Sequence, residues 1–138
     1  MSASNYLELA ILDHIFGGGD LTRPASVFIG LHTANPGETG SASEIAVGAY
    51  EREEVVNDNT GWDSAAAVSG LGTKKNTAII QFIDPVGANW GTITHFSIWD
   101  ELTAGNCLVV GALTASVVVN DGDPGPRFNV NGLSLTVD

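Results

Sequence analysis

The sequence predicts an all-β protein, an antiparallel β-sandwich of the jelly-roll-like or Ig-like kind, with one short N-terminal α-helix. Two observations lead to this prediction. About six to eight short apolar segments follow one another without helical spacing between them. Clusters of Gly, Pro, Asn and Asp separate these segments, and the 17 glycines suit a chain with many tight turns. We expect a single domain over residues 1–138.

The first element is the helix, which we expect from Tyr6 to Phe16. Ser4 or Asn5 can cap its start, and the glycines from Gly17 can close its end in the left-handed conformation. Residues 1–19 therefore form the helix and a glycine-rich turn. Apolar residues recur at helical spacing on one stripe, which a sandwich layer or a neighbouring subunit must cover. The candidate interface residues on this stripe are Leu7, Ile11 and Ile15.

Residues 26–138 are expected to form the sandwich. Val27, Ile29 and Leu31 alternate with Phe28, Gly30 and His32, which indicates the first strand. The further expected strands are Ala49–Val56, Thr77–Ile83, Thr92–Trp99, Cys107–Val119 (two strands or one long bent strand), Arg127–Val130 and Leu133–Val137. Within the stretch from Asn57 to Thr73, Ala65–Val68 could make a helical turn, and Ser69–Gly72 beside it reads as a mobile loop.

The charge of the chain argues against several classes of partner. It has 16 Asp and Glu against 5 Lys and Arg, a formal net charge of -11. Five cations cannot build the basic face that binding to nucleic acid or to an anionic membrane requires. The N-terminus lacks the charged and apolar regions of a signal peptide, and no apolar run reaches bilayer length. The single Cys107 forms no internal disulfide and fits assembly in a reducing cytoplasm.

No catalytic, metal or cofactor site is indicated by the motifs. His14, His32 and His95 lie on separate segments without a metal-ligand spacing, and no G-x-S-x-G motif is present. Cys107 opens an apolar strand and is interpreted as a core residue. Carboxylates at strand ends, above all Asp100 and Glu101, leave a small hydrolase as a weak hypothesis. A non-enzymatic role is favoured.

Three tryptophans raise the alternative of carbohydrate binding. Trp62, Trp90 and Trp99 could form a platform on which a sugar ring stacks. Aromatic residues on alternating strand positions belong more often to the core, and that interpretation is preferred. The alternative function is a carbohydrate-binding module for host-surface glycans.

Several segments, kept in the same order over nearly the whole chain, resemble a family of small bacteriophage virion proteins labelled phage tail fibre or minor tail protein. The most specific segment is Trp90–Asp100, with the sequence WGTITHFSIWD. The others are Asn5–Glu8 with Leu12–Gly18, Arg23–Ala25, Val27–Gly30, Leu31–Pro36, Gly111–Thr114 and Leu133–Asp138. The resemblance implies a structural component of the virion.

The resemblance allows two placements on the virion with equal weight. The protein would be either a capsid decoration or cement protein, or a component of the tail fibre or tail tip. Its partners would be other virion proteins, either the major capsid protein or tail proteins, together with further copies of itself. Assembly would take place in the host cytoplasm. Besides the helix stripe, the apolar strand Cys107–Val119 offers candidate interface residues at Val109 and Val117, because an exposed sheet edge can pair with a neighbour.

Overall fold

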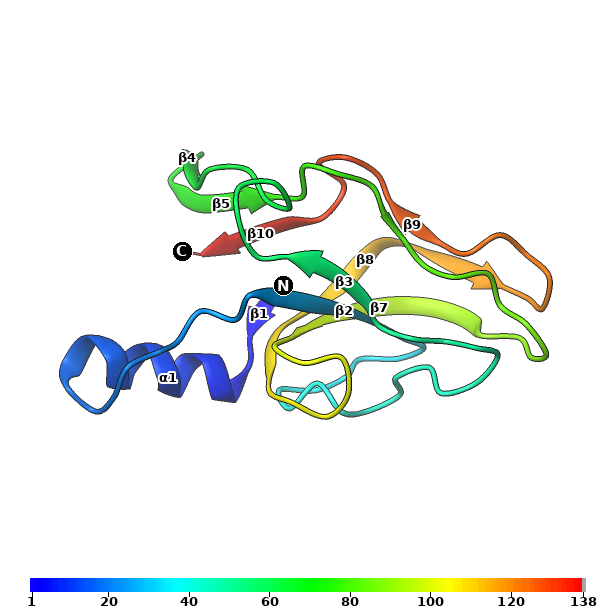
Figure 1. Ribbon diagram of the computed structural model, residues 1–138, viewed down its shortest axis with the longest axis horizontal. Helices are drawn as coiled ribbons and strands as arrows, with labels where there is room; N and C mark the ends of the chain where they lie inside the picture. The colour runs from blue at the N-terminus through cyan, green and yellow to red at the C-terminus, as the bar shows by residue number, and fades with distance from the viewer. Residues whose placement is uncertain (138) are drawn as a thin grey trace.

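Antiparallel β-sheets packed on one another form the body of the protein (Figure 1). The computed structural model describes residues 1–137. The largest sheet has the strand order β1 (Ser2–Ala3), β8 (Cys107–Val119), β7 (Gly91–Trp99), β2 (Ser26–His32) and β3 (Glu53–Val56). Facing it are a three-stranded sheet of β10 (Ser134–Val137), β5 (Leu71–Lys75) and β4 (Ala66–Val68), and the pair β6 (Ile80–Gln81) and β9 (Arg127–Phe128).

The main core fills the space between these layers. Ile29 and Leu31 of β2 pack with Ile93 and Phe96 of β7, and all four side chains are buried. The opposite layer contributes the buried side chains Ile80, Phe82 and Leu133. Burial of this much apolar surface is what stabilises a two-layer fold. The predicted all-β antiparallel sandwich with one short N-terminal helix is confirmed.

The large sheet is also covered on its second face. Register pairs Gly30 of β2 with Ser97 of β7, and both residues face away from the main core. A second cluster of Trp99, Cys107 and Val110, with Phe28 packed against it, lies on this face, and Arg52 of the β2–β3 connection covers the Trp99 ring. The apolar alternation of β2 therefore correctly identifies one buried face, while tertiary packing buries the other.

Three predicted strands are shorter in the structure. The strand expected over Ala49–Val56 begins at Glu53, because Ala49 has a φ of 61° and lies in a turn. Only Ile80–Gln81 of the segment Thr77–Ile83 is a strand, and only Arg127–Phe128 of Arg127–Val130. These segments pair with each other over a short distance and then run as irregular backbone.

The segments expected to be a helical turn and a mobile loop form a β-hairpin instead. β4 and β5 pair antiparallel, with Val68 opposite Leu71. Ser69 and Gly70 connect them, and both have positive φ values, 52° and 85°. Two consecutive residues with positive φ are the requirement of the tight turn whose twist suits a two-residue hairpin. The Ser-Gly dipeptide was the available signal for this hairpin.

β8 is one long strand with an interrupted register. Ile93 pairs with Val117 and His95 with Ala112, so residues 113–116 bulge opposite Thr94. The outer edge of β8 pairs with β1 only at Val109 and Val110, and no other strand of residues 1–137 joins it. The bent-strand alternative for this segment is thus confirmed, and its outer edge is free beyond Val110.

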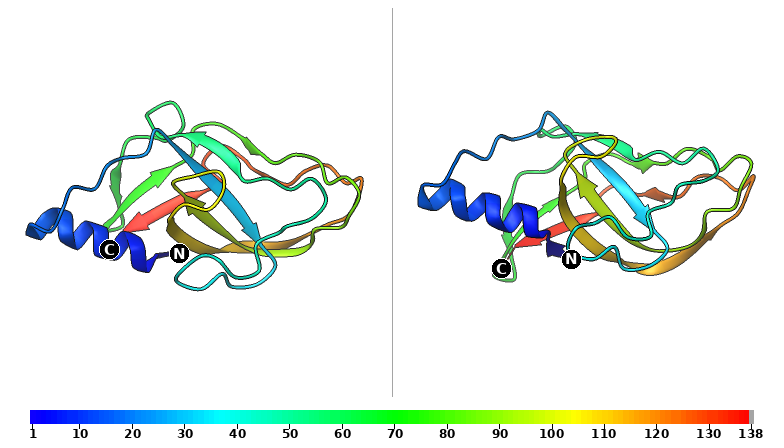
Figure 2. Two further views of the ribbon diagram at one scale, coloured as in Figure 1. Left: turned by 60° about the horizontal axis from the view of Figure 1, so that its bottom comes forward. Right: turned by 90° about the horizontal axis from the view of Figure 1, so that it is seen from below.

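The helix α1 (Asn5–Phe16) projects from the end of the body, and the chain then runs back to β2 (Figure 2). It agrees with the predicted range within one residue. We call residues 5–25, the helix with its return segment, the arm.

Candidate interaction surface

Helix α1 has no buried residue, although most of its side chains are apolar. The exposed fractions reach 78% for Phe16, 64% for Leu9, 63% for Ile15 and 53% for Leu12. A helix that is apolar around most of its circumference is normally enclosed by other structure. The arm is therefore the feature of the described residues that most clearly lacks a partner.

Two apolar stripes run along this helix. The predicted stripe of Leu7, Ile11 and Ile15 is half-buried at Leu7 and becomes more exposed toward the tip. The second stripe consists of Leu9, Leu12 and Phe16, which the rotation of about 100° per residue brings to another face. This second stripe is the more exposed one. The spacing of three and four residues in this second stripe is visible in the sequence, but the predicted interface included only the first stripe.

The base of the arm is fixed to the body through Ser4. Its backbone N–H donates to the carbonyl oxygen of Leu108 at 2.9 Å, and its hydroxyl donates to the carbonyl of Cys107. The same hydroxyl oxygen accepts the N–H of Leu7 at 3.2 Å and so caps the helix. Ser4 is 1% exposed. The start of the helix is therefore held rigidly while the rest projects.

The tip of the arm is closed by a glycine turn. Gly17 adopts a φ of 93°, and the N–H groups of Gly17 and Gly18 donate to the carbonyl oxygen of Asp13 at 3.0 and 2.6 Å. Further back, Nδ1 of His14 accepts the N–H of Leu21 at 3.3 Å. These bonds hold the return segment beside the helix, so the arm has a defined shape.

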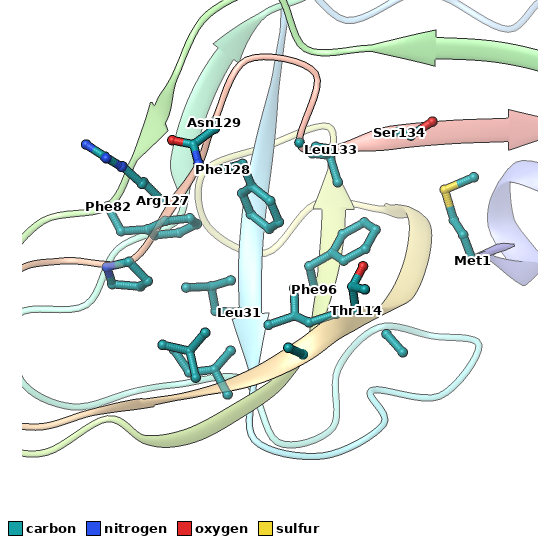
Figure 3. Close-up of a pocket in the computed structure, with 17 residues that line it drawn as sticks. Met1, Leu31, Phe82, Phe96, Thr114, Arg127, Phe128, Asn129, Leu133 and Ser134 are labelled. Atoms are coloured by element: carbon teal, nitrogen blue, oxygen red, sulfur yellow. The ribbon is translucent and has the colours of Figure 1, made fainter.

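An open cavity of about 600 Å³ lies between β8 and the segment from Pro126 to Ser134 (Figure 3). We call it the groove. Its floor is apolar, and the rings of Phe96 and Phe128 meet edge to face with their centroids 6.0 Å apart. Met1 lies at one end of the groove, while Thr114 contributes to its wall. Leu31, Phe82, Ile93, Leu113 and Leu133 complete the apolar lining.

The structure places the five candidate interface residues on three different surfaces. Leu7, Ile11 and Ile15 belong to the arm. Val117 is 43% exposed and lines the groove. Val109 pairs with Ala3 of β1 and packs against the main core. Four of these five residues thus lie on the arm or at the groove, and Val109 lies at the paired part of the β8 edge.

The three tryptophans lie in the core. Trp62 and Trp90 belong to the main cluster, and Trp99 belongs to the second cluster. Tyr50 packs edge to face on Trp90 with ring centroids 5.3 Å apart, and the Arg52 guanidinium lies 3.8 Å above the Trp99 ring. None of the three offers an exposed ring face on which a sugar could stack, so the preferred interpretation as core residues agrees with their positions.

A chain of buried hydrogen bonds links β2 and β7. Trp99 Nε1–H donates to Ser97 Oγ at 2.7 Å, and Ser97 Oγ lies 2.7 Å from His32 Nε2. His32 Nδ1 lies 2.9 Å from the carbonyl oxygen of Ala42, which can only accept, so Nδ1 carries the proton. The Ser97 hydroxyl then donates to Nε2. His32 and Ser97 are fully buried, and burial lowers the pKa of His32, so this pair connects strands and meets no substrate.

An ion pair that the sequence did not reveal covers the same face of the sheet. Arg52 Nε and Nη2 donate to the two carboxylate oxygens of Glu44 at 2.7 and 2.8 Å. Arg52 Nη1 donates to the backbone carbonyls of Glu101 and Ala104. The guanidinium thereby ties the connection between β2 and β3 to the loop between β7 and β8. No local motif identifies this arrangement, because Glu44 and Arg52 lie in irregular backbone between β2 and β3 and the two carbonyls belong to a distant loop.

Asp100, one of the two carboxylates considered for catalysis, and two aspartates of loops accept hydrogen bonds that close turns. Asp100 accepts the backbone N–H of Asn106 at 2.6 Å and its side-chain amide at 2.8 Å. Asp121 accepts the N–H of Gly87, and Asp123 accepts the N–H of Asn120.

Within residues 1–137, no three His, Cys, Asp or Glu side chains gather as metal ligands do. In the same described range, no helix has the length and apolar content to cross a bilayer.

Comparison with known proteins identifies the family. No curated protein matches the chain. The family model described as podophage GP4 fiber I protein gp80 matches residues 2–136, nearly the whole chain. This match confirms the resemblance to phage tail fibre proteins. The chain belongs to the podophage GP4 fiber I protein gp80 family and is a structural protein of the phage virion.

Proposed function

We propose that the protein is a non-enzymatic component of the tail fibre apparatus and that its arm docks on a neighbouring virion subunit. The family description, which names a fibre protein, supports placement on the tail. The observation that carries the docking role is the absence of any buried residue in α1, a helix with apolar side chains on most of its surface. The arm thus projects as a separate contact element (Figure 2).

The free energy gained by burying apolar side chains favours docking of this helix against another subunit of the assembled particle. Burying one Leu, Ile or Phe side chain contributes about 1.5 to 3 kcal/mol. The four most exposed side chains of α1 are Leu9, Leu12, Ile15 and Phe16. Docking of these side chains against another subunit supplies enough free energy for a specific contact. The anchoring of Ser4 adds to this, because a preformed arm loses little conformational entropy on binding.

The test is incorporation of an arm variant into particles. Phage carrying Leu12→Asp together with Phe16→Asp should assemble virions from which this protein is absent or strongly depleted, measured by mass spectrometry of purified particles. Val86→Asp is the matched control, since Val86 is 66% exposed on a loop of the body. Normal incorporation of the arm variant would contradict the docking role.

Immunogold labelling of wild-type virions tests the placement. Label at the tail supports the proposal, whereas label over the head would indicate capsid decoration and overturn the tail assignment.

A further inference from the structure

We infer that the subunit that receives the arm is a second copy of this chain, whose groove takes up the arm in a head-to-tail arrangement. The inference deepens the proposed function and rests on its docking role for the arm. Each copy would then contribute its arm to one neighbour and its groove to another.

The groove has the size and lining of a binding site. Its volume of about 600 Å³ lies within the range of about 300 to 1,000 Å³ that is typical of pockets for small molecules, so it has room for a few side chains of a partner. The apolar side chains of the lining that a partner can reach are the exposed Met1 and Val117 and the half-buried Leu113 and Phe128, and below them lie the buried rings of Phe82 and Phe96. In Figure 3 these rings face the hollow between β8 and the segment that follows β9. An apolar helix face is a suitable occupant for such a surface.

The second stripe of α1 has the spacing of a helix that binds in a groove. Leu9, Leu12 and Phe16 stand at positions i, i+3 and i+7, the anchor pattern of amphipathic helices that dock into hydrophobic grooves. These are also among the most exposed apolar side chains of the chain. The arm therefore presents three anchors in one row, at the end of the molecule that projects farthest (Figure 1).

The distribution of charge favours binding of the arm to the groove over binding of one arm to another. The arm carries Glu8, Asp13 and Asp20, with Arg23 as its one Lys or Arg. At the groove, Arg127 is exposed, and no carboxylate of residues 1–137 pairs with it. Among the described residues, the groove lining contains no Asp or Glu. An acidic arm is complementary to Arg127 at this groove, whereas two arms packed against each other would bring like charges together.

The arm does not fill the groove of its own copy. Ser4 fixes the start of the helix to the first residues of β8, and α1 runs from there away from the sheets (Figures 1 and 2). An arm and a groove on one molecule that cannot meet each other form a heterologous contact between molecules. Such contacts close into rings or continue as filaments.

Analytical ultracentrifugation of matched variants tests the inference. The wild type should self-associate with rising concentration. The arm variant Leu12→Asp with Phe16→Asp and the groove variant Thr114→Trp should each sediment as a monomer, with association weakened at least tenfold. Thr114 has an exposed side chain that lines the groove, and Ala115→Glu is a second groove variant should Thr114→Trp fail to fold. Val86→Asp is the control, and circular dichroism checks that each variant is folded.

The decisive experiment mixes the two variants. The arm variant still has an intact groove, and the groove variant still has an intact arm, so the mixture should form a one-to-one heterodimer that does not grow further. A mixture that stays monomeric overturns the inference. A groove variant that still dimerises indicates pairing between arms, and an arm variant that still associates indicates pairing through the free edge of β8; either result also overturns it.

The charge contribution and the proposed function have separate readouts. Arg127→Glu should weaken self-association several-fold, and unchanged association would contradict the electrostatic argument.

If the wild type stays monomeric at every concentration while the arm variant is lost from virions, the inference fails and the docking role of the arm stands. If the arm variant enters virions normally, the proposed function fails.

Discussion

At the scale of single residues, the stability of the second sheet face depends on Arg52. Its guanidinium binds both carboxylate oxygens of Glu44, two backbone carbonyls and the face of Trp99. Breaking a buried ion pair by removing one partner costs about 3 to 5 kcal/mol. Because the Glu44 side chain is 20% exposed, we expect Arg52→Met to lower the free energy of unfolding by about 2 to 3 kcal/mol, measured by urea denaturation.

Two further variants make this prediction specific. Arg23→Met, which changes an exposed arginine without an ion pair, should alter the free energy of unfolding by less than about 0.5 kcal/mol. Combining Arg52→Met with Glu44→Gln should recover part of the loss, since no carboxylate is then left without its partner. An effect of Arg52→Met no larger than that of Arg23→Met would show that the pair contributes little.

His32 gives the fold a predictable response to pH. Burial lowers its pKa below the ordinary value of 6.5, so the folded protein keeps the imidazole neutral where the unfolded chain takes up a proton. Stability from this residue is fully present above pH 6.5 and declines as the pH falls from there toward the folded pKa. Thermal denaturation of His32→Gln between pH 5 and 8 should therefore show a flatter acid limb than the wild type. Equal slopes for the two proteins would contradict this.

At the scale of elements, Ser4 couples the arm to the sheet. Ser4→Ala removes the helix cap and the hydrogen bond to the Cys107 carbonyl, and loss of a cap costs about 1 kcal/mol. We expect faster amide exchange in α1 and faster chymotryptic cleavage at Phe16, with the exchange of β2 and β7 unchanged. Ser2→Ala is the control, because the Ser2 hydroxyl is exposed and donates to the carbonyl of Ala3. Equal cleavage rates in the two variants would exclude the coupling.

Local sequence signals predict most of the elements in this protein. The helix, β2 and β7 each carry their own periodicity, and the structure has them within one residue of the expected bounds. The β4–β5 hairpin was missed because its strands are short and mostly exposed, so no apolar alternation marks them. Strand length was overestimated near Ala49, where a left-handed turn ends the extended backbone that the residue types favour.

The candidate surface was less predictable than the elements, for a physical reason. Helical spacing indicates which residues share a stripe, but only the tertiary structure shows whether a stripe is covered. Ile11 and Ile15 were expected beneath a layer or a neighbour, and within one copy they are exposed. The groove brings together segments far apart in the chain, as for Met1 with Phe128, and Arg52 likewise reaches the carbonyls of Glu101 and Ala104 in a distant loop. No local pattern encodes such contacts.

At the scale of the whole molecule, the net charge of -11 links stability to ionic strength. Like charges on a folded surface repel one another more than in the expanded unfolded chain, and added salt screens this repulsion within about 10 Å at 0.1 M and about 3 Å at 1 M. Raising NaCl from low to high concentration should therefore raise Tm, measured by differential scanning calorimetry.

A variant with fewer acidic residues tests the cause of this salt response. Glu38→Gln with Glu51→Gln removes two exposed carboxylates whose side chains make no hydrogen bond or ion pair among residues 1–137. If self-repulsion limits stability, this variant should melt at a higher temperature than the wild type at low salt and should gain less from added NaCl. Net repulsion also opposes the approach of two copies, so the same salt increase should strengthen the association of the wild type until the attraction at Arg127 is itself screened. A Tm that falls with NaCl would show that favourable ion pairs, and not repulsion between carboxylates, dominate the surface electrostatics.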